Sequence, residues 1–228
     1  DRSSTTLTIS DLFVIAEQLG CVWKLEKLCR NKALKAAVEK PENVKLFLNV
    51  DGNIIQDKAF IQGFTNRKAM KAGVPASDIV FEITERSDIE NYQILQQIMK
   101  HYADQGYEIA LDDVGAGHSG LNRVVNTTPD YLKADIELVR DIHKYKKKEI
   151  MMKLLLDYCN ATGAILIAEG IETVQELECL HSLGVHYGQG FFLGKPERAF
   201  GNISAESEEI LERLNRRQNI LFWDISGK

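Results

Sequence analysis

The stretch Tyr-Glu-Ile-Ala-Leu-Asp-Asp-Val-Gly-Ala-Gly, residues 107–117, runs from an apolar strand into a glycine-rich loop and places two adjacent carboxylates at the junction. Buried carboxylates repel each other, so a strand that ends on Asp112 and Asp113 is costly unless a cation neutralises them. Gly115 and Gly117 allow the backbone to leave the strand sharply. The alternative is a solvated turn in which an Asp caps the next helix. The other strands decide between these interpretations.

Apolar strands alternate with helices on both sides of this stretch. The predicted strands are Val44–Val50, Asp78–Thr84, Tyr107–Asp112, Tyr131–Ala134, Ala164–Ala168 and a last strand that ends between Val185–Tyr187 and Phe191–Leu193. The predicted helices are Asp11–Leu19, Val22–Val38, Asp57–Ala72, Asp88–Tyr102, Gly120–Val125, Lys144–Thr162, Val174–Leu183 and Ala205–Arg217. Strands that are apolar throughout and separated by helices indicate a parallel sheet covered on both faces.

The fold class that this alternation predicts is α/β, as a TIM-like (β/α)8 barrel. Six strands are visible, and we expect the first two of the eight to precede Asp1. Residues 1–200 are expected to form the barrel domain, incomplete on its N-terminal side. Residues 201–228 are expected to form a C-terminal helix and a linker toward a further domain.

Composition limits the class of protein. The net charge of −5 argues against general affinity for duplex nucleic acid, which depends on a basic surface. The longest apolar runs, such as Ala164–Ala168, are too short to span a bilayer, so we expect no membrane contact within this segment. The four cysteines show no close pairing and no metal-type spacing, which favours a reduced, cytoplasmic protein.

Each predicted strand carries a polar residue at or near its carboxyl end. In strand order these residues are Asn49, Glu82 and Glu85, Asp112 and Asp113, Lys133 and Asp135, Glu169 and Glu172, and Gln189. Each has a structural explanation when taken alone, such as a helix cap or a surface ion pair. Reactive groups of TIM barrels, however, lie at the carboxyl ends of the strands. Together these oxygen ligands predict a site for hard divalent cations, of the kind that cleaves phosphodiesters with two metals roughly 3.5–4 Å apart.

Six segments of the chain resemble the EAL domain, the bacterial phosphodiesterase of cyclic di-GMP. They occur in family order and lie within residues 9 to 197. The segments are Phe47-Leu-Asn-Val, Phe81-Glu-Ile-Thr-Glu85, Asp112-Asp-Val-Gly-Ala-Gly117 with Ser119 and Leu121, Lys133-Ala-Asp135, Ala168-Glu-Gly-Ile-Glu-Thr173, and Gly188-Gln-Gly190 with Gly194-Lys-Pro196.

The resemblance implies a TIM-like barrel with an antiparallel first strand and a role for each matched residue. The metal ligands would be Asn49, Glu82, Asp112 and Asp113. Lys133 would orient the attacking water, and Glu169 would bind the metal–water cluster or act as base. Gln189 would lie beside the water or the substrate, and Gly190 and Pro196 would bind substrate. Glu85 would serve catalysis by holding the loop of Gly115 and Gly117, and Glu172 would support the rim.

The chain departs from the family pattern in three places. The Glu-x-Leu motif that names the family is expected on a strand before Asp1. The family's substrate-binding Arg, two residues beyond the Leu of that motif, is not identifiable, and Arg2 is a poor match for it. Val114, His118 and Gly120 occupy positions where the family often has Phe, Tyr and Ser. These three positions lie in the loop after Asp113, which in the family couples metal binding to dimerisation. The substitutions therefore put this coupling in question more than the chemistry.

The resemblance implies hydrolysis of cyclic di-GMP to the linear dinucleotide pGpG with Mg²⁺ or Mn²⁺, inhibition by Ca²⁺, and a homodimer. One alternative is a receptor that binds cyclic di-GMP without cleaving it, and another is an interaction scaffold with neither activity. Every ligand position that can be inspected carries the family's residue type, which favours the enzyme.

Overall fold

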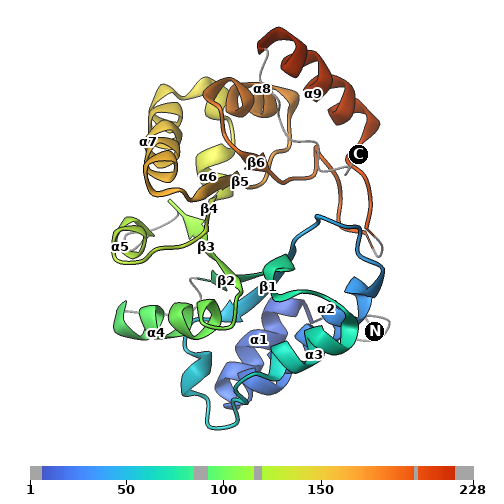
Figure 1. Cartoon of the computed structure of the whole chain (residues 1–228). Helices are drawn as coiled ribbons and strands as arrows, with labels where there is room; N and C mark the ends of the chain where they lie inside the picture. Colours follow the sequence, from blue (N-terminus) through green and yellow to red (C-terminus); the bar gives the residue numbers. More distant parts are fainter. Residues whose placement is uncertain (1–6, 85–91, 116–119, 198–199, 219–228) are drawn as a thin grey trace.

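The structure, a computed structural model, describes residues 7–84, 92–115, 120–197 and 200–218. Its centre is one parallel sheet with the strand order β1-β2-β3-β4-β5-β6 (Figure 1). The strands are β1 Leu46–Asp51, β2 Ile79–Thr84, β3 Glu108–Val114, β4 Tyr131–Ala134, β5 Ile165–Ala168 and β6 Tyr187–Gly188. This confirms the α/β class and the six predicted strands. All pairings between these six strands are parallel, so the antiparallel strand implied by the resemblance is not among them.

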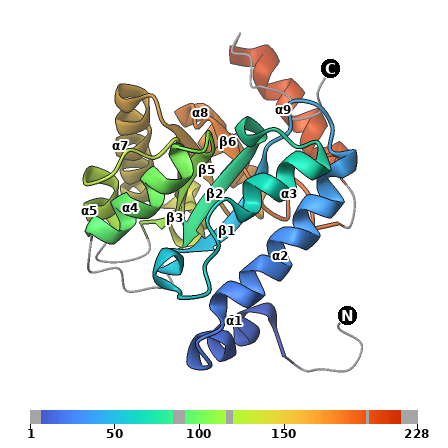
Figure 2. The ribbon, with the colours of Figure 1, turned by 60° about the horizontal axis from the view of Figure 1, so that its bottom comes forward.

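Helices surround the sheet on its outer side. They are α1 Ile9–Gln18, α2 Val22–Ala36, α3 Phe64–Ala72, α4 Tyr92–Ala103, α5 Gly120–Val125, α6 Ile136–Val139, α7 Lys146–Thr162, α8 Val174–Leu183 and α9 Ala205–Gln218. Short 3-10 turns lie at Ala37–Glu39, Ile54–Gln56, Ala76–Asp78 and Ile142–Lys144. Figures 1 and 2 place α2 and α3 beside β1 and β2, and α7 and α8 beside β5 and β6. Among the helices of the described ranges, none is both long and apolar enough to cross a membrane.

One predicted helix begins later than expected, and the structure contains one helix that was not predicted. The segment predicted as Asp57–Ala72 becomes helical only at Phe64, because Gly63 takes a left-handed φ of 68° and the Asp57 carboxylate accepts bonds from the Trp23 and Ala59 amides instead. The short helix α6 was not predicted, although Asp135 caps it by accepting a bond from the Glu137 amide. The predicted start of α4 at Asp88 lies outside the described residues.

The two faces of the sheet pack differently. The outer face and the helices form the main core, which contains Phe81, Ile109 and Leu132 among many others. The inner face has its own apolar layer, formed by Val80, Ala110, Tyr131 and Ile167 and covered in part by Phe47, Ile165 and Tyr187. Side chains alternate along a strand, so the residues two positions after this layer face the same way. Glu82, Asp112, Lys133 and Glu169 occupy those positions.

Candidate active site

Lys133 lies at the centre of the acidic rim. Its Nζ is 2.7 Å from Glu82 Oε1, 2.8 Å from Asp112 Oδ1 and 2.6 Å from Glu169 Oε1. These partners come from β2, from β3 and from the residue that follows β5. Only 5% of Lys133 is exposed, so its ammonium is held by carboxylates rather than by solvent. The structure thus brings four predicted site residues from four neighbouring strands into one contact.

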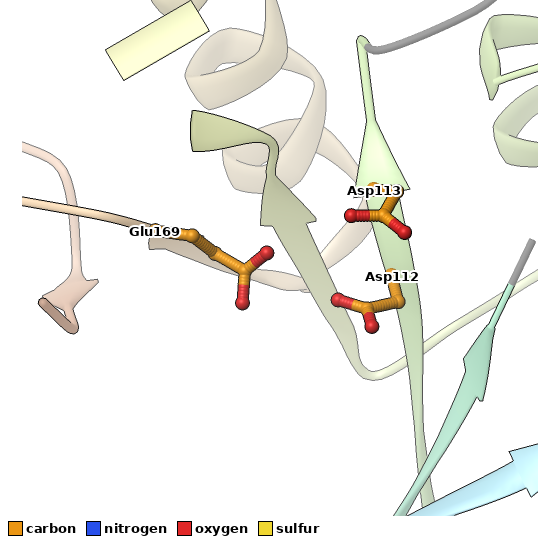
Figure 3. A group of neighbouring side chains, drawn as sticks. All are labelled: Asp112, Asp113 and Glu169. Atoms are coloured by element: carbon orange, nitrogen blue, oxygen red, sulfur yellow. The ribbon is translucent and has the colours of Figure 1, made fainter. Parts of the chain in front are cut away.

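A second grouping lies beside the lysine. Asp112, Asp113 and Glu169 each offer a carboxylate oxygen, and these three oxygens lie within 4.8 Å of one another. Figure 3 shows the three side chains converging from β3 and from the end of β5. Divalent cations bind carboxylate oxygens at about 2.0–2.6 Å, so oxygens this close together can share one ion. The donor set therefore fits Mg²⁺ or Mn²⁺.

An irregularity in β3 explains how two consecutive aspartates reach one site. Neighbouring residues of a regular strand point to opposite faces. Here the pairing of β3 with β4 shifts between Leu111 and Val114, and Asp113 takes a left-handed φ of 56°. Asp is one of the few residues other than glycine that adopt this conformation. The local twist brings the Asp113 carboxylate to the same side as that of Asp112.

Burial and charge act against each other in this cluster. The pKa of Glu169 is raised to about 7: burial is the largest cause, the charge of Lys133 opposes it, and the charges of Asp112 and Glu82 add to it. Burial likewise raises the pKa of Glu82. Burial alone would lower the pKa of Lys133, but the three carboxylates outweigh it and raise the value. The lysine therefore stays an ammonium, and the surrounding carboxylates exceed it in number.

The ends of β1 and β6 complete the rim. Asn49 is the register partner of Glu82 in the pairing of β1 with β2, and its side chain is exposed. Gln189 follows β6, and its Nε2 donates a hydrogen bond to Glu169 Oε1. Its backbone amide donates to Ala168 O at 2.8 Å, which ties this residue to the end of β5.

Gly188 and Gly190 have a structural role that the sequence did not reveal. A Cβ at Gly190 would lie 2.2 Å from both the N and the O of Ile171, and one at Gly188 would lie 2.5 Å from Ile171 Cδ1. Only glycine permits this approach of the two loops. The close contact with Ile171 is enough to require glycine at position 190. Substrate binding by Gly190 therefore stays a prediction.

The remaining predicted residues lie around the rim. Glu172 is exposed and donates its backbone amide to Glu176 Oε2 at 3.0 Å, and Pro196 is exposed. Gly115 adopts a φ of 107°, as expected for the turn after β3. Glu85 and Gly117 lie outside the described residues.

Sequence reasoning missed Glu176 as a support of the rim. Its carboxylate accepts bonds from the amides of Asp141 at 2.8 Å and of Glu172 and Thr173 at 3.0 Å. Glu176 thereby joins the loop after α6 to the loop that carries Glu169. The Thr-x-x-Glu spacing of a capping box at Thr173 was the available signal.

The family model of the EAL domain matches residues 2–196. The chain belongs to the EAL domain family. Two relatives are PdeA of Borreliella burgdorferi, named a cyclic di-GMP phosphodiesterase and 25% identical over 201 residues, and PdeR of Escherichia coli K12, with the same activity in its name and 28% identical over 160 residues. These matches cover 86% and 69% of this chain but only 30% and 24% of the relatives' own lengths.

Solved EAL structures have the same architecture. A standalone EAL protein from Vibrio cholerae O395, bound to c-di-GMP, is 27% identical with a TM-score of 0.73, and the match covers 81% of this chain and 78% of that one. BlrP1 of Klebsiella pneumoniae, in a manganese/cy-diGMP complex, is 28% identical with a TM-score of 0.74, and the match covers 80% of this chain and 47% of that one. The TIM-barrel-like arrangement of these neighbours confirms the predicted fold.

Proposed function

We propose that this chain carries the catalytic rim of a metal-dependent phosphodiesterase that hydrolyses cyclic di-GMP to pGpG. The observation that supports this most is the convergence of Glu82, Asp112 and Glu169 on Lys133, with the Asp113 carboxylate beside those of Asp112 and Glu169. Relatives named cyclic di-GMP phosphodiesterases and EAL structures that contain c-di-GMP support the choice of substrate.

Each residue has a role in this proposal. Asn49, Glu82, Asp112 and Asp113 would hold Mg²⁺ or Mn²⁺, and Glu169 would bind beside them or accept a proton. Bound divalent ions acidify water and stabilise negative charge on phosphate oxygens. Lys133 donates an N–H to the attacking water and favours its deprotonated form. Gln189 keeps Glu169 in place, while Glu85 and Glu172 steady the loops of the rim.

Product analysis tests the activity. The natural protein is incubated with cyclic di-GMP and Mn²⁺ or Mg²⁺, and the nucleotides are separated by chromatography. We expect pGpG with either ion and none with Ca²⁺, which prefers longer bonds and more ligands. Binding of cyclic di-GMP without product in every metal would instead support the receptor. Absence of both binding and product would support the scaffold, and equal turnover with Ca²⁺ would contradict the two-metal interpretation.

We also propose that the protein is a cytoplasmic homodimer. Its four cysteines are free thiols, in keeping with a reducing compartment.

The proposed dimer surface lies on α5 and α7. Val125 of α5 and Ile150 and Leu154 of α7 are exposed apolar residues, and the Tyr158 hydroxyl joins the two helices by donating to Val124 O at 3.0 Å. We expect light scattering to give the mass of a dimer, and Leu154→Asp to give that of a monomer. A monomeric mass for the unaltered protein would contradict the proposal.

A further inference from the structure

A chain of hydrogen bonds connects the start of α9 to the rim. Ser207, in the first turn of α9, is fully buried, and its hydroxyl donates to Phe192 O at 2.7 Å. The Ser204 hydroxyl lies 2.8 Å from that of Ser207, and the Ser204 amide donates to Leu193 O at 2.6 Å. Two consecutive carbonyls of the 190–194 turn are therefore held by Ser207 of α9 and by Ser204, which directly precedes the helix.

The same turn is bonded to the loop after β5. The Phe192 amide donates to Ile171 O at 3.0 Å, and the Ile171 amide donates to Gln189 O at 3.1 Å. Gly190 packs so closely on Ile171 that no Cβ fits between them. The turn and the loop are therefore joined by two backbone hydrogen bonds and a close backbone contact. The last hydrogen bond of this series runs from the side-chain amide of Gln189 to Glu169, which contacts Lys133.

We propose that Ser207 is a positioning residue that sets the place of the Gln189 side chain against Glu169. Ser207 contacts neither substrate nor the reacting atoms, and it acts through Phe192 and Ile171. Its burial and its two hydroxyl bonds give it one orientation. The helix α9, which packs against α8 and whose Arg213 pairs with Glu178, is therefore a structural input to the active site.

Ser207→Ala removes the shorter of the two hydroxyl bonds to Phe192 O, the other being that of Ser204 at 3.2 Å, and leaves the rim residues unchanged. If the proposed phosphodiesterase activity holds, on which this kinetic arm rests, we expect kcat to fall about fivefold, the factor that one intramolecular hydrogen bond provides. Ser182→Ala is the matched control, because that exposed hydroxyl also donates to a backbone carbonyl, Cys179 O, on α8. The control should leave kcat unchanged.

A double variant separates positioning from general loosening of the fold. If Ser207 acts through Gln189, adding Ser207→Ala to Gln189→Ala should lower kcat no further. A purely structural role would multiply the two losses in kcat, and that result would overturn the proposal. An unchanged kcat in Ser207→Ala alone would also overturn it.

A spectroscopic readout does not depend on activity. The side-chain amide resonance of Gln189, assigned by its loss in Gln189→Ala, reports its hydrogen bond to Glu169. We expect this resonance to shift in Ser207→Ala and to stay in place in Ser182→Ala. A resonance that does not move in Ser207→Ala would overturn the proposal. A protein that cleaves nothing but still shows the shift would contradict the phosphodiesterase activity alone.

Discussion

The residue that organises the rim is Lys133. A lysine with three carboxylates within 2.8 Å is positioned by charge as firmly as a side chain can be, because each partner restrains a different direction. The lysine and the proposed metal ions compensate the same negative charge. A rim that binds metal ions would therefore have to accommodate them without losing the ammonium of Lys133.

Replacing Lys133 separates two possible roles. If Lys133 orients the water, Lys133→Ala should lower kcat at least ~100-fold, the scale of losing a preorganised electrostatic group, with little change in Mn²⁺ affinity. Single-turnover cleavage and Mn²⁺ titration on the same variant measure both effects. Lys45→Ala is the control, since Lys45 pairs with Glu108 near the start of β3, away from the carboxyl-end rim. Near-normal turnover with tighter Mn²⁺ binding would assign Lys133 to charge balance alone.

Glu26 is a second buried charge, on the outer side of the sheet. Its Oε1 accepts a bond from the Asp51 amide at 2.5 Å, and its Oε2 pairs with Arg30. The pKa of Glu26 is raised to about 7: burial is the largest cause, Arg30 opposes it, and the Asp51 charge adds to it. Burial raises the pKa of Cys29 and of Tyr102, and the charge of Glu26 adds to the rise at both. Because Asp51 ends β1 two residues after Asn49, Glu26 holds the strand that carries a proposed metal ligand.

The raised pKa of Glu26 predicts how stability changes with pH. The folded chain holds this proton more tightly than the unfolded chain, so the stabilisation is full below about pH 4.5 and is lost as the pH rises through about 7. Relative to Glu26→Gln, we expect the unfolding free energy of the unaltered protein to fall by about 3 kcal/mol across that range. Urea unfolding of both proteins at several pH values measures it. A difference that stays constant with pH would show that Glu26 titrates as in the unfolded chain.

At the scale of elements, the site depends on how loops meet more than on the strands themselves. β3 ends in an irregularity that aligns Asp112 with Asp113, and the β5 and β6 loops interlock through Ile171. Both features place backbone close to backbone. Adding a single methyl group at such a contact should therefore displace the side chains of the rim.

Gly190→Ala tests the interlock. The new Cβ would lie 2.2 Å from backbone atoms of Ile171, so the two loops must separate and carry Gln189 away from Glu169. We expect a loss of about 1–3 kcal/mol in unfolding free energy, as for other overpacked sites, together with a lower kcat. Gly194→Ala is the control, because its Cβ would meet Asn202 O only at an ordinary 3.8 Å. Equal stability of the two variants, measured by urea unfolding, would contradict the interlock.

At the scale of the whole molecule, the parallel order of the strands brings the site residues, from Asn49 on β1 to Gln189 after β6, to one edge of the sheet. Each helix returns the chain to the opposite end of the sheet, so all six strands point their carboxyl ends the same way. Cations that bind this edge join four separate strands. Metal binding should therefore stabilise the fold as a unit.

Thermal unfolding with and without metal tests this coupling. We expect Mn²⁺ at about 100 times its Kd to add roughly 2.7 kcal/mol of stability, and EDTA to remove it. Asp113→Asn should weaken the rise in Tm, whereas Asp104→Asn, at an exposed residue paired with Lys100, should retain it. If the Tm of the unaltered protein does not change when Mn²⁺ is added, a metal site at this rim is contradicted.

Much of the fold and rim is readable in the sequence because it depends on local order. Apolar strands between amphipathic helices imply parallel pairing, and parallel pairing alone predicts that Glu82, Asp112, Lys133 and Glu169 meet at one edge. The boundaries of α5 and α8 could also be predicted, since α8 has its Thr173 cap and its final Gly184 within a few residues of the helix.

Only the tertiary structure decided the features that join distant parts of the chain. The turn of Asp113 into a left-handed φ depends on the pairing of β3 with β4. The bond from Ser207 to Phe192 O and the contact of Gly190 with Ile171 each span more than a dozen residues. Such contacts have no periodic signature in the sequence, because their partners are chosen by how the packed loops fit together.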